Sequence, residues 1–410
     1  MPRLLLCGKG RSGKNEQYDH RKGLAQSHGM PLHYAPESSR NGRSTHAGGR
    51  GVRKVKHTTP AGPASFQYKD CSRPVWNTAG TMSVSPVSNI PDFLRGAIAP
   101  LFTPFDAQGR LDLAAIPSLL QWLYRGGARS VFARSGMGRM HTFTVAETKA
   151  LAEAVMRAER GGMGVLLGCS GEWLGRARGE RPDPDHYVEQ AAELTRFAAK
   201  IGADASVHVV PAALPPRTGE TAQEVVLRYF QEMDRVTRVP IVIYQPPGLP
   251  EEYQLTPALL TALRRLPSVR GLKLSTQDPA VFGPIAEVSR DGFALICGHE
   301  GYYLNGLEQG ACGVIGQGSM VYPRILRAVA ERFEVGDREG ARRAQEDVAR
   351  ALKVSDGLNS VVVMKQYMAR KGVRVQPFDR EGPAPYPDSV VDRVERELDA
   401  ILAAYPQPKV

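Results

Sequence analysis

Short apolar runs alternate with amphipathic stretches over most of the chain after about residue 82. Eight runs have the length of buried strands, and they cover residues 95–103, 130–135, 164–169, 205–210, 240–245, 269–274, 293–298 and 311–316. Between or after them lie segments whose apolar residues recur three or four positions apart: 112–126, 144–160, 185–200, 220–236, 256–265, 279–288, 301–309 and 322–335. The first pattern is typical of strands and the second of helices, so we expect eight β/α pairs.

Strands that alternate with helices of this length predict right-handed crossovers and a parallel sheet. Eight even repeats favour an α/β fold of the closed (β/α)8 type, a TIM barrel, over residues 82–336. A Rossmann-like open sheet is the alternative, but no G-x-G-x-x-G motif follows the first strand, where APLFTPF stands. Further helical stretches near 338–355, 358–371 and 388–404 predict a C-terminal helical appendage over 337–410.

Residues 1–81 differ in composition from the rest of the chain. They hold 14 of the 53 Lys and Arg residues but only 4 of the 42 Asp and Glu residues, which leaves 39 basic and 38 acidic residues afterwards. They show no sustained periodicity, so we expect a basic, disordered tail, or a true start at Met82. A phosphate-binding loop is disfavoured because Asn15 follows Lys14 where Ser or Thr is needed. With a nearly neutral body, we expect no nucleic-acid partner.

The composition of the whole chain is that of a globular protein. It has 410 residues, 42% of them hydrophobic and 23% charged, and no apolar run approaches the ~18 residues of a membrane-spanning helix. The five cysteines are scattered without CxxC spacing, which does not indicate a disulfide framework. We therefore expect a cytoplasmic protein without a membrane partner.

Two residues at the ends of neighbouring predicted strands carry the candidate chemistry. Lys273 stands alone among apolar residues in VRGLKLS, and Tyr244 ends the preceding strand in VPIVIYQPPG. Burial favours a neutral amine that can attack a carbonyl, and a nearby phenol can pass the protons that this reaction requires. The alternatives are a lysine that reaches past the strand end and a tyrosine that only packs in the core.

Several segments, in their order along the chain, resemble the dihydrodipicolinate synthase/N-acetylneuraminate lyase family of class I aldolases. They are GAIAPLFTPFDAQGRLD, IVIYQPPG, GLKLST and CGHEGYYLNGLEQGACGVIGQ, and the resemblance covers roughly residues 95–400. It implies a lysine imine at Lys273, a catalytic tyrosine at Tyr244 and backbone contacts to a 2-oxo acid near Ile315. It also implies a homo-oligomer, a dimer or a tetramer.

The chain departs from the family pattern where that pattern binds substrate. Ser135, Gly136 and Met137 begin the segment in which the family carries Gly-Thr-Thr-Gly-Glu, so both threonine hydroxyls are missing. We still expect these three residues to contact the substrate. Ala212 and Ala213 replace tyrosines of typical synthases, and Leu249 stands where a synthase has a carboxylate-binding arginine. Typical dihydrodipicolinate synthase activity is therefore not expected.

Another group must then bind the anionic end of the substrate. Arg134, at the end of the second strand, is the preferred candidate, and Arg139 is a second. The loop GEWLGRARGERPDPD offers Arg176, Arg178 and Arg181, although a solvated basic loop is the plainer interpretation. His299 is a lone histidine, and no spacing of carboxylates and histidines indicates a metal site.

These observations favour a lyase without a cofactor. We expect an aldolase or a dehydratase that acts on a small 2-oxo acid, such as a 2-keto-3-deoxy sugar acid, through a Schiff base. The alternative is a barrel that has lost efficient catalysis and serves as a metabolite-binding or regulatory protein. The missing hydroxyls favour that alternative, and the retention of both Lys273 and Tyr244 argues against it.

Overall fold

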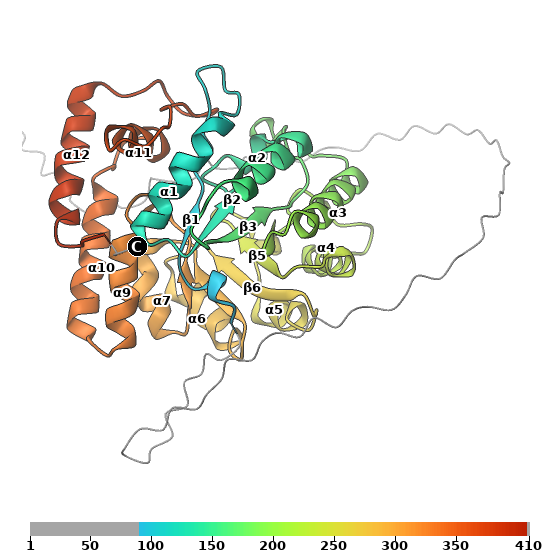
Figure 1. Ribbon diagram of the computed structural model, residues 1–410. Helices are drawn as coiled ribbons and strands as arrows, with labels where there is room; N and C mark the ends of the chain where they lie inside the picture. The colour runs from blue at the N-terminus through green and yellow to red at the C-terminus, as the bar shows by residue number, and fades with distance from the viewer. Residues whose placement is uncertain (1–89, 408–410) are drawn as a thin grey trace, which may run out of the picture. The chain divides into compact units, whose positions relative to one another are not determined.

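The computed structural model describes residues 90–407, and eight parallel strands close into a barrel in sequence order, β1 to β8. Figure 1 shows these strands at the centre of a ring of helices. Their bounds are β1 Gly96–Pro100, β2 Ser130–Ala133, β3 Gly164–Gly168, β4 Ala205–Val209, β5 Ile241–Gln245, β6 Val269–Leu274, β7 Ala294–Cys297 and β8 Gly313–Val314. The predicted (β/α)8 barrel is confirmed.

Helices follow the strands in the predicted order. They are α1 Ile116–Gly126, α2 Val145–Arg157, α3 Pro184–Lys200, α4 Ala222–Val236, α5 Pro257–Leu263, α6 Pro279–Glu287, α7 Tyr303–Glu308, α8 Gln317–Val321 and α9 Pro323–Glu334. The short α8 was not predicted, because five residues are too few to show helical periodicity. Side chains cap several helices: Thr144 and Glu147 form a capping box at α2, and Thr221 and Glu224 form one at α4.

Alternation along the strands divides the core into two parts. One apolar cluster fills the barrel interior and includes Val207, Val242, Tyr244, Ile296 and Ile315. The larger cluster lies between the strands and the helices, and contains residues such as Ile243, Leu272 and Leu274. Because successive side chains of a strand point to opposite faces, Lys273, between Leu272 and Leu274, points into the barrel.

Three helices complete the fold beyond the barrel: α10 Arg338–Lys353, α11 Ser360–Arg370 and α12 Asp388–Leu402. They gather with α9 on one side of the molecule (Figure 1). The chain between α11 and α12 packs on the turn after β2, where Asp379 accepts hydrogen bonds from Arg139. Arg380 donates to the carbonyl oxygen of Thr142 at 2.7 Å and pairs with Glu147. The C-terminal segment is thereby fastened to the loops that surround the barrel mouth.

Two sequence predictions depend on which residues the structure describes. The tail over residues 1–81 lies outside the described residues, and so does Met82 as a possible start. Within residues 90–407, no helix is long and apolar enough to cross a membrane.

Candidate active site

Lys273 and Tyr244 lie side by side inside the barrel. They are register partners across β5 and β6, and the Lys273 ammonium nitrogen lies 4.1 Å from the centre of the Tyr244 ring. Both are almost fully buried, at 5% and 7% exposure. The Tyr244 ring packs on Phe132 in a T-shaped pair, with ring centroids 6.5 Å apart. In the described part of the chain, Lys273 has no carboxylate partner and is not held in an ion pair.

The turn after β2 approaches the hydroxyl of Tyr244 from the other side. A β-carbon added at Gly136 would lie 3.0 Å from that oxygen, so glycine leaves the phenol room that a larger residue would restrict. The Ser135 hydroxyl is used within the turn, where it donates to the Leu101 carbonyl and accepts from the Gly138 N–H. Met137 is half-buried and packs against the outer core. Contacts of Ser135, Gly136 and Met137 with substrate stay a prediction.

Arg134 is fully buried, and its guanidinium donates to backbone carbonyls. The acceptors are Met140, Gly168, Ser170 and Gly171, with the Ser170 oxygen at 2.5 Å. Burial lowers the pKa of Arg134. Its backbone is left-handed, with φ of 53°, a conformation that a residue with a side chain rarely adopts. Arg134 therefore ties the loop after β3 to the loop after β2, and its proposed carboxylate contact has to compete with these hydrogen bonds.

Arg139 and Ile315 also have partners inside the protein. Arg139 forms a bidentate ion pair with Asp379, with the shortest N to O distance 2.6 Å, so this pair holds the C-terminal segment and does not leave Arg139 to a substrate. Ile315 lies in the barrel interior together with Tyr244. Its N–H donates to the Cys297 carbonyl at 2.8 Å, and its backbone contact with a 2-oxo acid stays a prediction.

Glu300 follows His299 after the end of β7, and no role was predicted for it from the sequence. Its buried carboxylate accepts from the Gly318 N–H at 2.8 Å. A β-carbon at Gly316 would lie 1.7 Å from the second oxygen, so only glycine fits there. The carboxylate thus fixes the start of α8 beside the end of β8. The glycines in GVIGQGS were the available signal, but their partner lies 16 and 18 residues earlier and could not be identified from spacing.

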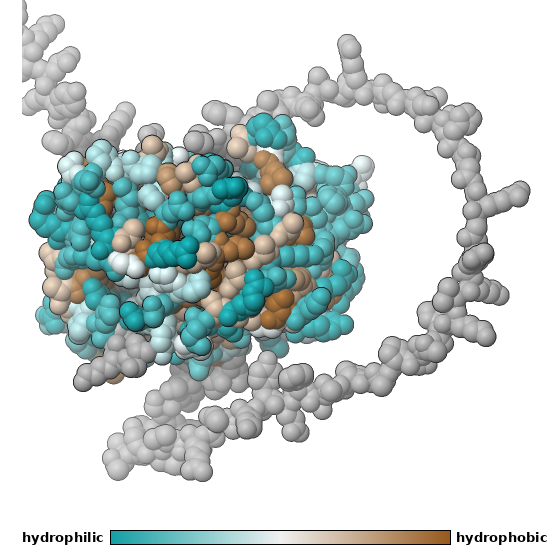
Figure 2. All heavy atoms as spheres, turned by 45° about the horizontal axis from the view of Figure 1, so that its top comes forward, coloured by the Kyte–Doolittle hydropathy of each residue, from teal (hydrophilic) through white to brown (hydrophobic). Residues whose placement is uncertain are grey.

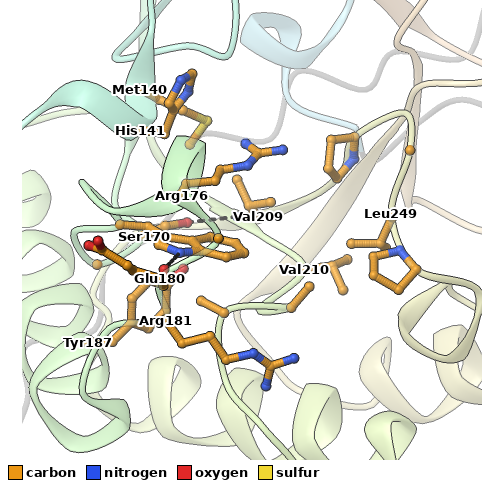
Figure 3. A pocket seen from close by; sticks show the side chains of 18 of the residues that line it. Met140, His141, Ser170, Arg176, Glu180, Arg181, Tyr187, Val209, Val210 and Leu249 are labelled. Carbon is orange, nitrogen blue, oxygen red and sulfur yellow. Dashed lines mark hydrogen bonds between the residues drawn. The ribbon is translucent and has the colours of Figure 1, made fainter. Parts of the chain in front are cut away.

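A cavity of about 900 Å³ opens beside the barrel mouth. Its lining comes from the loops after β2, β3, β4 and β5: Arg134, Met140, His141, Ser170, Gly171, Trp173, Arg176, Arg178, Gly179, Glu180, Arg181, Tyr187, Val209, Val210, Ala212, Ala213, Pro215, Pro246, Pro247, Gly248, Leu249 and Pro250. Figure 3 shows side chains of this lining. Lys273 and Tyr244 are not part of it, but Val209 is, and Val209 is the register partner of Tyr244.

The arginine-rich loop after β3 forms one wall of this cavity. Trp173 donates its indole N–H to the Glu180 carbonyl at 2.6 Å, and its ring lies 5.5 Å from the Arg176 guanidinium. Arg178 forms a bidentate pair with Glu180 at the exposed edge. Burial raises the pKa of the Tyr253 hydroxyl, and Arg181 beside it opposes part of this increase. The structure places this loop at the cavity, and a contact of its arginines with a substrate stays a prediction.

Within residues 90–407, no group of three or more His, Cys, Asp or Glu residues could hold a metal ion. His299 uses Nδ1 to accept from the Gly301 N–H and has Gln277 beside Nε2. It thus caps the turn after β7, which is the structural role that a lone histidine most often has.

Two relatives in sequence carry the name of a synthase. A 4-hydroxy-tetrahydrodipicolinate synthase of Thermus thermophilus is 33% identical over 251 residues, which cover 60% of this chain and 77% of the relative. A protein of the same name from Exiguobacterium sibiricum is 27% identical over 254 residues, which cover 62% and 80%.

Solved structures share the fold. A sialic acid aldolase of Ruminococcus gnavus superposes with a TM-score of 0.67 and 18% identity, over 77% of this chain and 100% of that one. A prophage protein from E. coli K12, determined in complex with pyruvate, gives 0.64 and 21% over 75% and 98%. The model of the Dihydrodipicolinate synthetase family matches residues 93–401, and the chain therefore belongs to this family of class I lyases and aldolases.

Proposed function

We propose that this chain is a lyase that acts on a 2-oxo acid through a Schiff base at Lys273, with Tyr244 as the proton-carrying group. One observation carries the proposal: inside the barrel, a buried lysine that has no carboxylate partner within residues 90–407 lies 4.1 Å from the ring of a buried tyrosine. An amine in such surroundings can act as a nucleophile, and the phenol beside it can donate and accept protons. The scattered cysteines support a cytoplasmic setting.

The aldol cleavage would proceed through an imine and an enamine. The Lys273 amine adds to the C2 carbonyl, and loss of water gives an imine. The imine takes up the electron pair of the C3–C4 bond as that bond breaks, which leaves an aldehyde and an enamine. Tyr244 relays the proton of the C4 hydroxyl to C3 of the enamine. Hydrolysis of the imine then releases pyruvate and restores Lys273.

A dehydration would use the same lysine and the same tyrosine. After the imine forms at Lys273, Tyr244 takes a proton from C3 to give the enamine and returns it to the C4 hydroxyl, which leaves as water as the C3–C4 double bond forms. Hydrolysis of the unsaturated imine releases the product and restores Lys273. Both reactions use the imine as the electron sink. The residues that contact the rest of the substrate therefore determine whether cleavage or dehydration occurs.

A typical dihydrodipicolinate synthase activity is not part of the proposal. Gly136 and Met137 bring no hydroxyl to the Tyr244 region, and the cavity near Leu249 and Ala213 is apolar. A charge-assisted hydrogen bond contributes about 1.5–3 kcal/mol, so the loss of several would slow that reaction by orders of magnitude. The missing hydroxyls also support a second candidate, a binding protein that retains the pocket without efficient turnover.

The test is a substrate panel. The panel contains 4-hydroxy-2-oxo acids with polyhydroxylated or apolar tails, N-acetylneuraminate, and pyruvate with aspartate semialdehyde, and both pyruvate release and loss of water are measured. We expect turnover of at least one 2-oxo acid that disappears in Lys273→Ala and persists in Lys149→Ala, a surface control that pairs with Glu193. Turnover that survives in Lys273→Ala would overturn the mechanism. Binding without turnover would favour the second candidate, and efficient condensation with aspartate semialdehyde would refute the selectivity.

A further inference from the structure

The cavity beside the barrel mouth begins one strand away from the reactive pair. Val209 lines it and is the register partner of Tyr244, which in turn is the register partner of Lys273. Neighbouring strands lie about 4.8 Å apart, so the cavity wall at Val209 is roughly 10 Å from the backbone of Lys273. A molecule held at Lys273 by its 2-oxo end can therefore extend past Tyr244 into the cavity.

The two sides of the cavity differ in chemistry. Val210, Ala213 and Leu249 belong to an apolar side, and the loop over residues 173–181 supplies a cationic one. Figure 3 shows Val210 and Leu249 on one side, with Arg176 and Arg181 on the other. Figure 2 shows hydrophobic residues near the middle of the face that is turned to the viewer. The volume of about 900 Å³ far exceeds what a three-carbon acid needs.

Arg176 is the cation best placed to receive an anion. It is half-buried, its guanidinium lies over the Trp173 ring, and within residues 90–407 it forms no ion pair. Its neighbour Arg178 is already paired with Glu180 at 2.6 Å. The indole N–H of Trp173 donates to the Glu180 carbonyl, which fixes the loop around Arg176. A planar guanidinium held in this way matches the two oxygens of a carboxylate.

We propose that this cavity binds the end of the substrate remote from the 2-oxo group, and that it selects an apolar body with a terminal carboxylate bound by Arg176. The proposal rests on the proposed function, because the 2-oxo end must be held at Lys273. Apolar surface favours an apolar body over a polyhydroxylated chain, whose hydroxyls would lose water without gaining partners. The group that binds the substrate carboxylate, Arg176, thus comes from the loop after β3. Leu249, after β5, contributes apolar surface.

Aldol addition of pyruvate to three aldehydes tests this inference with the full chain. The aldehydes are 4-carboxybenzaldehyde, benzaldehyde and glyceraldehyde, and kcat/KM is measured for each. We expect 4-carboxybenzaldehyde to exceed benzaldehyde by roughly 10-fold or more, the scale of one charge-assisted hydrogen bond, and glyceraldehyde to be the poorest. Arg176→Gln should remove the preference for the carboxylate. Arg196→Gln, which changes the same charge on the exposed face of α3, should retain it.

Borohydride reduction in the presence of pyruvate, on the same proteins, separates the two proposals. Without modification of Lys273 in the wild type, the proposed function fails. If pyruvate is trapped in both the wild type and Arg176→Gln, three results would overturn the subsite alone. These are a carboxylate preference equal in both proteins, a preference for glyceraldehyde, and no addition to any of the aldehydes.

Discussion

The pairing of Lys273 with Tyr244 gives each residue a separable task. The lysine forms the covalent bond, whereas the phenol only moves protons, so the loss of the phenol oxygen should spare imine formation. In Tyr244→Phe the ring and its packing on Phe132 remain. We expect turnover to fall by ~10²-fold or more, the usual scale for a positioned acid–base group. Steady-state kinetics and borohydride trapping would show this together, and wild-type turnover in the variant would remove Tyr244 from the mechanism.

Gly136 should tune the same phenol by space alone. The methyl group of Gly136→Ala would lie 3.0 Å from the Tyr244 oxygen, which is closer than ordinary contact, so the ring has to shift. We expect kcat to fall by about 10-fold, because a displaced proton donor loses part of its contribution. Gly283→Ala is the matched control, since its methyl would meet its nearest neighbour at 3.5 Å. Equal kcat values in the two variants would show that the turn does not position Tyr244.

At the scale of elements, the ion pair between Arg139 and Asp379 joins the turn after β2 to the segment before α12. The Asp379 side chain is fully buried, and Arg139 is 21% exposed. Arg139→Met would leave a buried carboxylate without its partner, so we expect a loss of roughly 3 kcal/mol in the free energy of unfolding. Urea denaturation measures this loss. The double variant Arg139→Met with Asp379→Leu should recover much of it, and a double variant as unstable as the single one would contradict this account.

The packing of β4 against α3 and α4 should make the fold sensitive to acid. His208 is fully buried between Thr195 and Tyr229, and burial lowers its pKa to about 3. The unfolded chain binds this proton near pH 6.5 and the folded chain does not, so stability falls as the pH drops from 6.5 towards 3. Because of His208, the free energy of unfolding should fall by about 2 kcal/mol between pH 6 and pH 4.5, and this fall should be absent in His208→Gln. Denaturation curves at both pH values measure this fall. An equal fall in the wild type and in His208→Gln would refute the role of His208.

The whole molecule shows which contacts a sequence can predict. The alternation of strands and helices was sufficient for the barrel, and because β5 and β6 are consecutive, Tyr244 and Lys273 had to be neighbours. The partners of Arg134 and Arg139 could not be predicted in this way. Arg139 pairs with a residue 240 positions away, and Arg134 donates to carbonyls 6 to 37 positions away. The fold supplies acceptors for both arginines, and the contact of Arg134 with a substrate anion stays a prediction.

The cavity is also a property of the assembled barrel. Its walls come from four loops, and its mixed apolar and cationic character arises only when the loop over 173–181 faces Leu249 and Val210. The sequence indicated the arginines but not the surface opposite them. The homo-oligomer that the family resemblance implies also stays a prediction, which light scattering in solution would test.

The central claim is that one lysine of this chain forms a Schiff base with a 2-oxo acid, and peptide mass mapping after borohydride reduction with pyruvate tests it most directly. We expect the mass of one reduced pyruvate adduct on the peptide that contains Lys273, and no such adduct on Lys365, which is also fully buried but donates to the carbonyls of Thr103 and Phe378. Lys273→Ala should abolish the adduct. Labelling that persists in Lys273→Ala, or that occurs at another lysine of the wild type, would contradict the account.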